Sequence, residues 1–231
     1  MTPTRWSVIS AASLVGLIVL PVAGALVAGG TILTLAVGSA TWLASVAFKA
    51  RAARWLNRAV GEQSMHIIAA LQGLLSANAE LGFAYLALVA FKIASVPNAL
   101  AFGVGAAAAE VVYVLFKGVT AARNEQALLE WERGARTSLC VRYSVPIERL
   151  VASIGHVSSR GLAFASLKLP LPGGLWPAAA AIFFFSLTDG AAYYGHLLKW
   201  NWSDPKVCRT FHGALAVLAA LELSLMVFAL G

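Results

Sequence analysis

The chain has 231 residues, of which 60% are hydrophobic and only 12% are charged, and its mean hydropathy is +0.79. Because a soluble core cannot enclose that much apolar surface, the composition excludes a soluble domain and predicts an all-α, polytopic membrane helix bundle. The formal net charge of +7 does not indicate nucleic-acid binding, since the basic residues lie in short segments between apolar runs.

Apolar stretches long enough to cross a bilayer recur along the whole chain. A hydrocarbon core about 30 Å thick requires about 20 mainly apolar helical residues, each adding about 1.5 Å. On this criterion, we predict transmembrane helices at residues 6–28, 31–48, 64–91, 98–116, 146–167, 175–199 and 210–230. These seven helices form a single transmembrane domain over residues 1–231.

The count of seven depends on Gly29 and Gly30, which separate the first two apolar stretches. A tight turn there is favoured because glycine lacks Cβ and reaches positive φ at little cost. Without that turn, the two stretches would form one crossing and the count would be six.

The distribution of lysine and arginine predicts the orientation. Short cytoplasmic connections accumulate these residues. Of the 17 present, all except Lys92, Arg160 and Lys168 fall on the side of the N-terminus. We therefore expect a cytoplasmic N-terminus and an outside C-terminus in the cell (plasma) membrane. The longest cytoplasmic connection, residues 117–145, carries mixed charges and is predicted to form an amphipathic surface helix.

The two cysteines, Cys140 and Cys208, both fall in connections predicted to be cytoplasmic. Thiols stay reduced there, and neither cysteine belongs to a spacing typical of metal ligands. The sequence therefore predicts no structural disulfide.

Ionisable residues at membrane depth are candidates for function. Each costs a few kcal/mol or more against lipid, so it usually faces the protein interior. Five lie near the middle of predicted helices: Glu80, Glu110, His156, Asp189 and Glu222. Three further histidines lie nearer the helix ends, where the interface can hydrate them: His66, His196 and His212.

The predicted helix at 146–167 has the clearest polar pattern. At about 100° per residue, Arg149, Ala152, His156 and Ser159 share one face, and Glu148 lies about 80° from His156. This face is expected to line a cavity or to contact other helices. His156 is then either a metal ligand or proton-transfer group, or simply the donor of an interhelical hydrogen bond.

Three polar motifs follow one another along the chain: Glu80-Leu81-Gly82, Gly103-Val104-Gly105 ahead of Glu110, and Glu148-Arg149 with Ala152 and His156. Their order within residues 79–190 resembles the YhfC-like intramembrane protease family, distant relatives of the CAAX-prenyl protease clan. Glu80-Leu81-Gly82 is similar to the family's glutamate motif. Gly103-Val104-Gly105 precedes Glu110 at the spacing of the family's GxGxxxxE helix. The family's ERxxAxxxH motif is matched at every specified position, by Glu148, Arg149, Ala152 and His156.

Three positions depart from the family pattern. Ala79 replaces the first of two paired glutamates, and Ala106 replaces a frequent histidine. Phe185 stands four residues before Asp189, where the family's HxxxD motif has histidine. These departures put a metal site in doubt, because a catalytic zinc normally takes three protein ligands and the chain retains one of the expected histidines.

The resemblance implies roles for the remaining residues in peptide-bond hydrolysis within the membrane. Glu80 would be the general base that activates water, and Glu110 a second catalytic polar group. His156 would stabilise the oxyanion or bind a divalent metal such as zinc. Glu148, Arg149 and Asp189 would support and orient these groups.

Several functions remain open from the sequence. They are an intramembrane glutamate- or metal-dependent peptidase acting on a transmembrane peptide, a catalytically impaired homologue that binds membrane segments or acts as a scaffold, and a small proton-coupled transporter. Membrane lipids are expected partners of all three. A shared catalytic site requires Glu80, Glu110 and His156 to converge, so a separation of more than about 10 Å between Glu80 and His156 would exclude it.

Overall fold

The computed structural model describes residues 3–60, 64–121 and 125–231, and in these ranges the chain forms helices without strands. Seven of the helices are long: α1 (Pro3–Val27), α2 (Ile32–Val60), α3 (Met65–Ala90), α4 (Val96–Ala121), α7 (Ser144–Lys168), α8 (Leu175–Leu197) and α9 (Pro205–Leu230). Two are short: α5 (Glu125–Thr137) and α6 (Leu139–Arg142). The predicted all-α bundle is confirmed.

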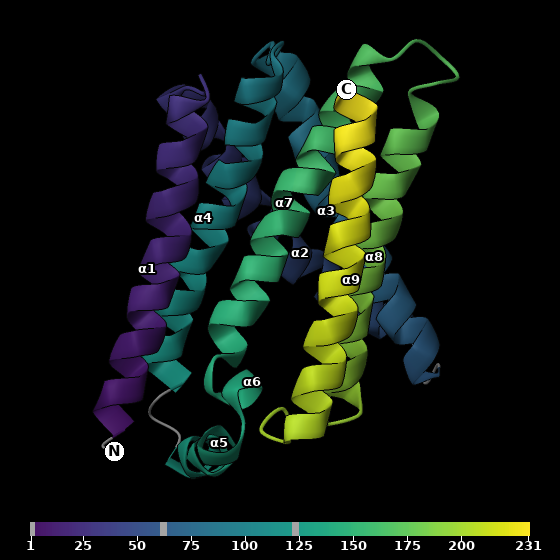
Figure 1. Ribbon diagram of the computed structural model, residues 1–231. Helices are drawn as coiled ribbons and strands as arrows, with labels where there is room; N and C mark the ends of the chain where they lie inside the picture. Colours follow the sequence, from purple (N-terminus) through teal and green to yellow (C-terminus); the bar gives the residue numbers. More distant parts are fainter. Residues whose placement is uncertain (1–2, 61–63, 122–124) are drawn as a thin grey trace.

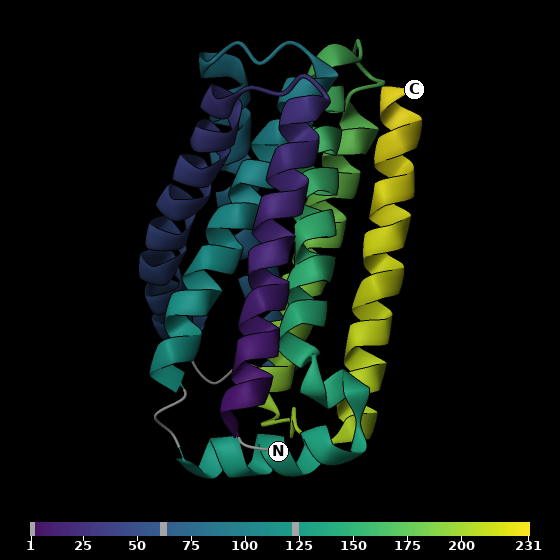
Figure 2. The same cartoon turned by 60° about the vertical axis from the view of Figure 1, so that its left-hand side comes forward.

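The long helices run side by side between two ends of the bundle, and the two chain termini lie at opposite ends (Figure 1). Helix α5 lies across the end that holds the N-terminus (Figure 2). It occupies the connection for which the sequence predicts an amphipathic surface helix, and its charged residues include Glu130, Glu132 and Arg136.

Among the described residues, five helices are long and apolar enough to cross a membrane: α2, α3, α4, α8 and α9. The chain is therefore that of an integral membrane protein. Helix α1 contributes a shorter described apolar segment, Ala11–Val27. Helix α7 falls short because polar side chains, His156 and Arg160 among them, lower its hydropathy.

The predicted turn at the glycine pair is present. Gly29 has φ of +92°, which L side chains rarely adopt. A Cβ atom on Gly30 would lie 2.6 Å from Ala101 Cβ, so the turn also needs a glycine for packing. Because of this turn, α1 and α2 are separate helices.

Helix α7 packs against α1, α3, α4, α8 and α9, so protein surrounds the face that the sequence marks as polar. Helices α3 and α8 approach closely at Gly73, where a Cβ atom would lie 2.9 Å from the backbone nitrogen of Gly190. Their approach brings the middle of α3 next to the middle of α8, which carry Glu80 and Asp189 respectively.

The end of the second helix differs from the prediction. Helix α2 continues to Val60 rather than ending at residue 48, so Lys49, Arg51, Arg54 and Arg58 lie within it. The hydropathy criterion stopped at the first charge, but lysine and arginine are good helix formers and the backbone continues past them.

The prediction that no structural disulfide forms is wrong. Cys140 of α6 and Cys208 of α9 form a disulfide, with Cα atoms 6.2 Å apart. The pairing follows from packing, since Ala135, Val141 and Cys208 form one buried apolar cluster. The two cysteines are 68 residues apart in the sequence, so no local pattern predicts that they pair.

Candidate functional site

Three carboxylate and imidazole groups predicted from sequence converge inside the bundle. Glu110 Oε2 of α4 accepts a hydrogen bond from His156 Nε2 of α7 at 2.7 Å. On the other side of the ring, His156 Nδ1 lies 3.6 Å from Glu80 Oε2 of α3. This separation is far below the 10 Å limit, so the geometric requirement for a shared site is met.

Glu80 is bound by two cations of the same chain. Lys49 Nζ lies 2.5 Å from Oε1, and an Arg160 guanidinium nitrogen, Nη2, lies 2.7 Å from Oε2. The Glu80 and Arg160 side chains are only 3% and 2% exposed. Each carboxylate oxygen of Glu80 therefore faces a positive side chain.

Glu110 is paired in the same way. Arg149 Nη1 lies 2.9 Å from Glu110 Oε1, and Arg149 Nη2 donates to Glu148 Oε1 at 2.5 Å. The structure thus brings together two of the three residues predicted to support the site. We call the following residues the central cluster: Lys49, Glu80, Glu110, Glu148, Arg149, His156 and Arg160.

Asp189, the third predicted supporting residue, is connected to this cluster through a serine. Ser76 Oγ donates a hydrogen bond to Asp189 Oδ2 and accepts one from Lys49 Nζ at 3.1 Å. Asp189 therefore lies beside the cluster, and it does not contact His156 directly.

A cavity of about 250 Å³ adjoins the cluster between α2, α3 and α8. Its polar lining residues are Lys49, Gln72, Ser76, Asp189, Tyr193 and His196. His196 is exposed and Ser76 is buried, so the cavity leads from the surface to the Lys49 and Asp189 side chains. A small polar molecule can reach these two charges from the end of the bundle near the carboxyl terminus of α8.

Phe185 lies beside His156, at the position where the resemblance would place a histidine. Its ring packs against the His156 ring, with centroids 5.8 Å apart, and the Arg160 guanidinium lies 5.5 Å from its centroid. Ala79 and Ala106, the other two departures, are buried. An aromatic ring and a guanidinium thus take the space beside His156.

These surroundings do not fit a zinc ion at His156. Each glutamate beside the His156 ring is paired with an arginine, Glu80 with Arg160 and Glu110 with Arg149. These two guanidinium groups would repel a divalent metal ion at the ring. Within the described part of the chain, one group of three metal-ligating side chains lies close together, and it is elsewhere: Cys140, Cys208 and His212.

The remaining predicted residues lie outside the cluster. Glu222 of α9 is 3% exposed, and its Oε1 has no hydrogen-bond partner among the described residues. His66 stacks on Tyr194, with ring centroids 4.8 Å apart. His212 faces the two cysteines.

Sequence reasoning missed Lys49, Ser76 and Arg160 as members of the site. A signal existed for Arg160, because it follows His156 by four residues and so shares its helix face. Ser76 had the same signal, because it precedes Glu80 by four residues in α3, whereas Lys49 has none, since its partners Glu80 and Ser76 come from another helix.

Chemically, the arrangement is a network of charge pairs in which Arg149 Nε, Arg160 Nε and one ring atom of His156 lack hydrogen-bond partners among the described residues. His156 Nδ1 has no hydrogen-bond partner within the described residues, and it is directed at Glu80. No protein-family model matches the chain, and neither does any curated protein or solved structure.

Proposed function

We propose that this protein is a membrane-embedded binding protein, a catalytically impaired homologue of intramembrane proteases that binds a ligand instead of hydrolysing peptide bonds. One observation carries this proposal: Lys49 and Arg160 hold the two carboxylate oxygens of Glu80. A general base needs an oxygen within hydrogen-bond reach of the attacking water. Glu80 has both oxygens directed at cations instead.

The charge balance of the central cluster supports the same conclusion. Buried carboxylates require positive partners, because the low dielectric of the interior penalises isolated charges. Here the cations are Lys49, Arg149 and Arg160, and they match Glu80, Glu110 and Glu148 one for one. Adding a divalent metal to these six residues would leave two positive charges without a partner among them.

The cavity beside Asp189 is the proposed binding site. Within the described residues, the hydrogen bond to its carboxyl group comes from Ser76, so the group keeps acceptor capacity for a ligand. A volume of about 250 Å³ suits a small molecule rather than a helical segment. We infer a small ligand with a protonated amine that would donate to Asp189, while Tyr193 and Gln72 contact its polar remainder. Lys49 also lines the cavity, but its charge is compensated by Glu80.

The proposal includes a membrane topology. All seven long helices cross the membrane, with the N-terminus in the cytoplasm and the C-terminus outside the plasma membrane. The bias of lysine and arginine supports this orientation, and the odd number of crossings agrees with termini at opposite ends of the bundle (Figure 1). The cavity then opens toward the cytoplasm. Labelling single cysteines placed at each terminus with a membrane-impermeant reagent tests the orientation.

Hydrolysis is tested on the protein purified in detergent. Cleavage of a helical membrane peptide is compared among wild type, Glu80→Gln and His156→Ala. We expect no cleavage above the buffer rate in any of them. Cleavage by the wild type that both substitutions abolish would establish a peptidase and overturn the proposal.

Ligand binding is tested by thermal unfolding with a panel of small primary amines and their neutral hydroxyl analogues. An amine at 100 times its Kd adds about 2.7 kcal/mol of stability, which raises Tm measurably. Asp189→Asn should remove this increase, while His66→Ala, outside the cavity, should retain it. If no amine stabilises the wild type more than its analogue does, the assigned ligand class is wrong.

A proton-coupled transporter is a second candidate. The observation in its favour is the continuous path from the cavity through Asp189, Ser76 and Lys49 to Glu80. In proteoliposomes, amine uptake that depends on a proton gradient would favour transport over binding alone.

A further inference from the structure

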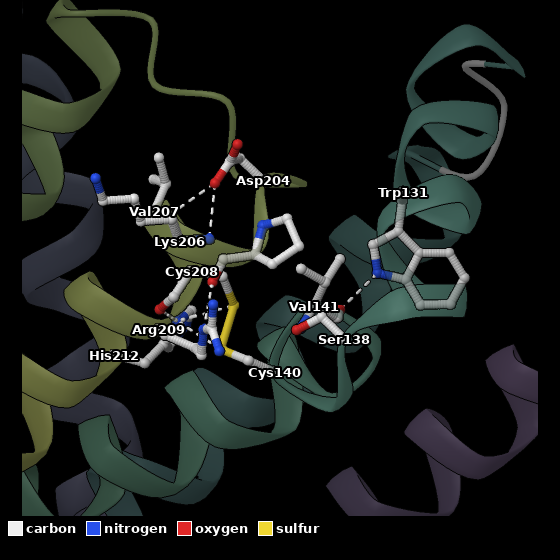
Figure 3. Close-up of a disulfide and its surroundings, with 11 residues drawn as sticks. Trp131, Ser138, Cys140, Val141, Asp204, Lys206, Val207, Cys208, Arg209 and His212 are labelled. Carbon is white, nitrogen blue, oxygen red and sulfur yellow. Dashed lines mark hydrogen bonds between the residues drawn. A yellow bond between two sulfur atoms is a disulfide. The ribbon is translucent and has the colours of Figure 1, made fainter.

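A second cluster of reactive side chains lies at the end of the bundle that holds α5. Cys140 belongs to α6, whereas Cys208 and His212 share one face of α9 because they are four residues apart. His212 Nδ1 lies 3.5 Å from Cys208 Sγ and 3.9 Å from Cys140 Sγ (Figure 3). Two sulfurs and an imidazole nitrogen therefore meet at one point.

We propose that Cys140, Cys208 and His212 bind a zinc ion when the two cysteines are reduced. This site is separate from the central cluster, and of the proposed function it uses only the membrane topology. Thiolate and imidazole are the ligands that zinc prefers, whereas magnesium and calcium take oxygen ligands.

The distances fit a tetrahedral zinc centre. Bonds of about 2.3 Å to sulfur and about 2.0 Å to nitrogen place sulfur and nitrogen about 3.5 Å apart around such an ion. The two sulfur to Nδ1 distances, 3.5 and 3.9 Å, are close to this value. The two sulfurs, which are bonded to each other in the oxidised form, would move apart to about 3.8 Å.

The disulfide form converts to the zinc-bound form in two steps, reduction and metal binding. A thiol reductant gives two electrons and two protons to the disulfide, which becomes two thiols while the reductant becomes a disulfide. Zinc then displaces the two thiol protons and binds both thiolates. His212 Nδ1 donates to the Cys208 carbonyl at 2.8 Å in the disulfide form. It binds the metal after the ring turns from that carbonyl toward the sulfurs and its proton resides on Nε2.

Both elements that carry the ligands are held in place without the metal. Trp131 Nε1 donates to the Val141 carbonyl at 3.0 Å, which fixes α6 against α5. The Asp204 side chain accepts hydrogen bonds from the amides of Lys206 and Val207, which caps α9 one turn before Cys208 (Figure 3). Such a preformed site binds a metal at a lower cost in chain entropy.

Burial and the number of ligands indicate a zinc site close to the surface, with one coordination position left for water. Cys208 and His212 are buried, and Cys140 is partly buried, so the ion would lie just below the surface. Within the described residues, this group offers three ligands, which leaves the fourth tetrahedral position for water. On the proposed topology, the site faces the cytoplasm, where thiols remain reduced.

The test measures metal binding by the full-length protein in detergent. The protein is reduced with a phosphine, stripped with a chelator and titrated with Zn²⁺ and, in parallel, with Co²⁺. We expect one metal per chain and a thiolate-to-cobalt charge-transfer band. Protein oxidised to the disulfide should bind neither metal. Reduced wild type that shows no stoichiometric zinc and no such band would overturn the proposal, and this readout requires no variant.

Variants then identify the ligands. Cys140→Ser, Cys208→Ser and His212→Gln should each weaken zinc binding about ten-fold or more. His66→Gln is the matched control, because His66 lies outside both the Cys140, Cys208 and His212 group and the cavity, and this variant should bind zinc like the wild type. Thermal unfolding confirms that each variant is folded. Unchanged affinity in His212→Gln would remove the imidazole from the site and refute the three-ligand assignment.

Discussion

Replacement of Arg160 by methionine tests whether the central cluster is a closed set of buried charge pairs. In the wild type, Arg160 binds Glu80 Oε2 at 2.7 Å and Ser159 Oγ at 3.0 Å, and its side chain is 2% exposed. Methionine keeps an unbranched apolar stem, although it is about two atoms shorter than arginine. The substitution mainly removes the cation, which leaves Glu80 Oε2 facing an apolar group.

Removing one member of a buried ion pair typically costs 3–5 kcal/mol of unfolding free energy. Lys49 still binds Glu80 Oε1 in the variant, so we expect the lower end, about 3 kcal/mol. The double variant Glu80→Gln with Arg160→Met removes both charges. Its loss should be about 2 kcal/mol smaller than the sum of the two single losses, since the pair is coupled.

Unfolding in mixed micelles, followed by tryptophan fluorescence during titration with a denaturing detergent, gives these free energies. Arg58→Met is the matched control, because Arg58 is exposed in the last turn of α2, and it should change stability by less than about 0.5 kcal/mol. A loss below about 1 kcal/mol for Arg160→Met, or additive losses in the double variant, would refute the closed cluster of buried pairs.

Three further predictions use the same unfolding assay. Gly73→Ala places a Cβ atom against the α8 backbone and should cost about 1–3 kcal/mol, whereas Gly82→Ala, in the same helix with no neighbour within 4 Å, should not destabilise. Ser76→Ala removes the donor to Asp189 and should cost about 1–2 kcal/mol, so an unchanged midpoint would contradict that hydrogen bond. Gly29→Ala forces a side chain into positive φ and should cost about 1 kcal/mol, and no loss would indicate that the turn relaxes.

The sequence by itself determined the helices and their membrane character. Hydropathy depends on composition along a short window, and a helix satisfies its backbone hydrogen bonds locally, so both can be read without knowing any neighbour. The glycine pair likewise marked the turn between α1 and α2, because its conformational freedom is a local property. The same reasoning ended α2 too early, since charge limits membrane insertion but does not limit helix formation.

The sequence also selected Glu80, Glu110 and His156 as residues that lipid would force inward, and the structure brings them together. Only tertiary structure decided what surrounds them. Lys49 was expected beyond the end of its helix and Arg160 on the opposite side of the membrane, yet both bind Glu80.

The disulfide between α6 and α9 was missed for the same physical reason. A charge pair or a sulfur contact between distant segments depends on how the helices are positioned relative to one another. No local pattern of residues encodes the distance between two helices.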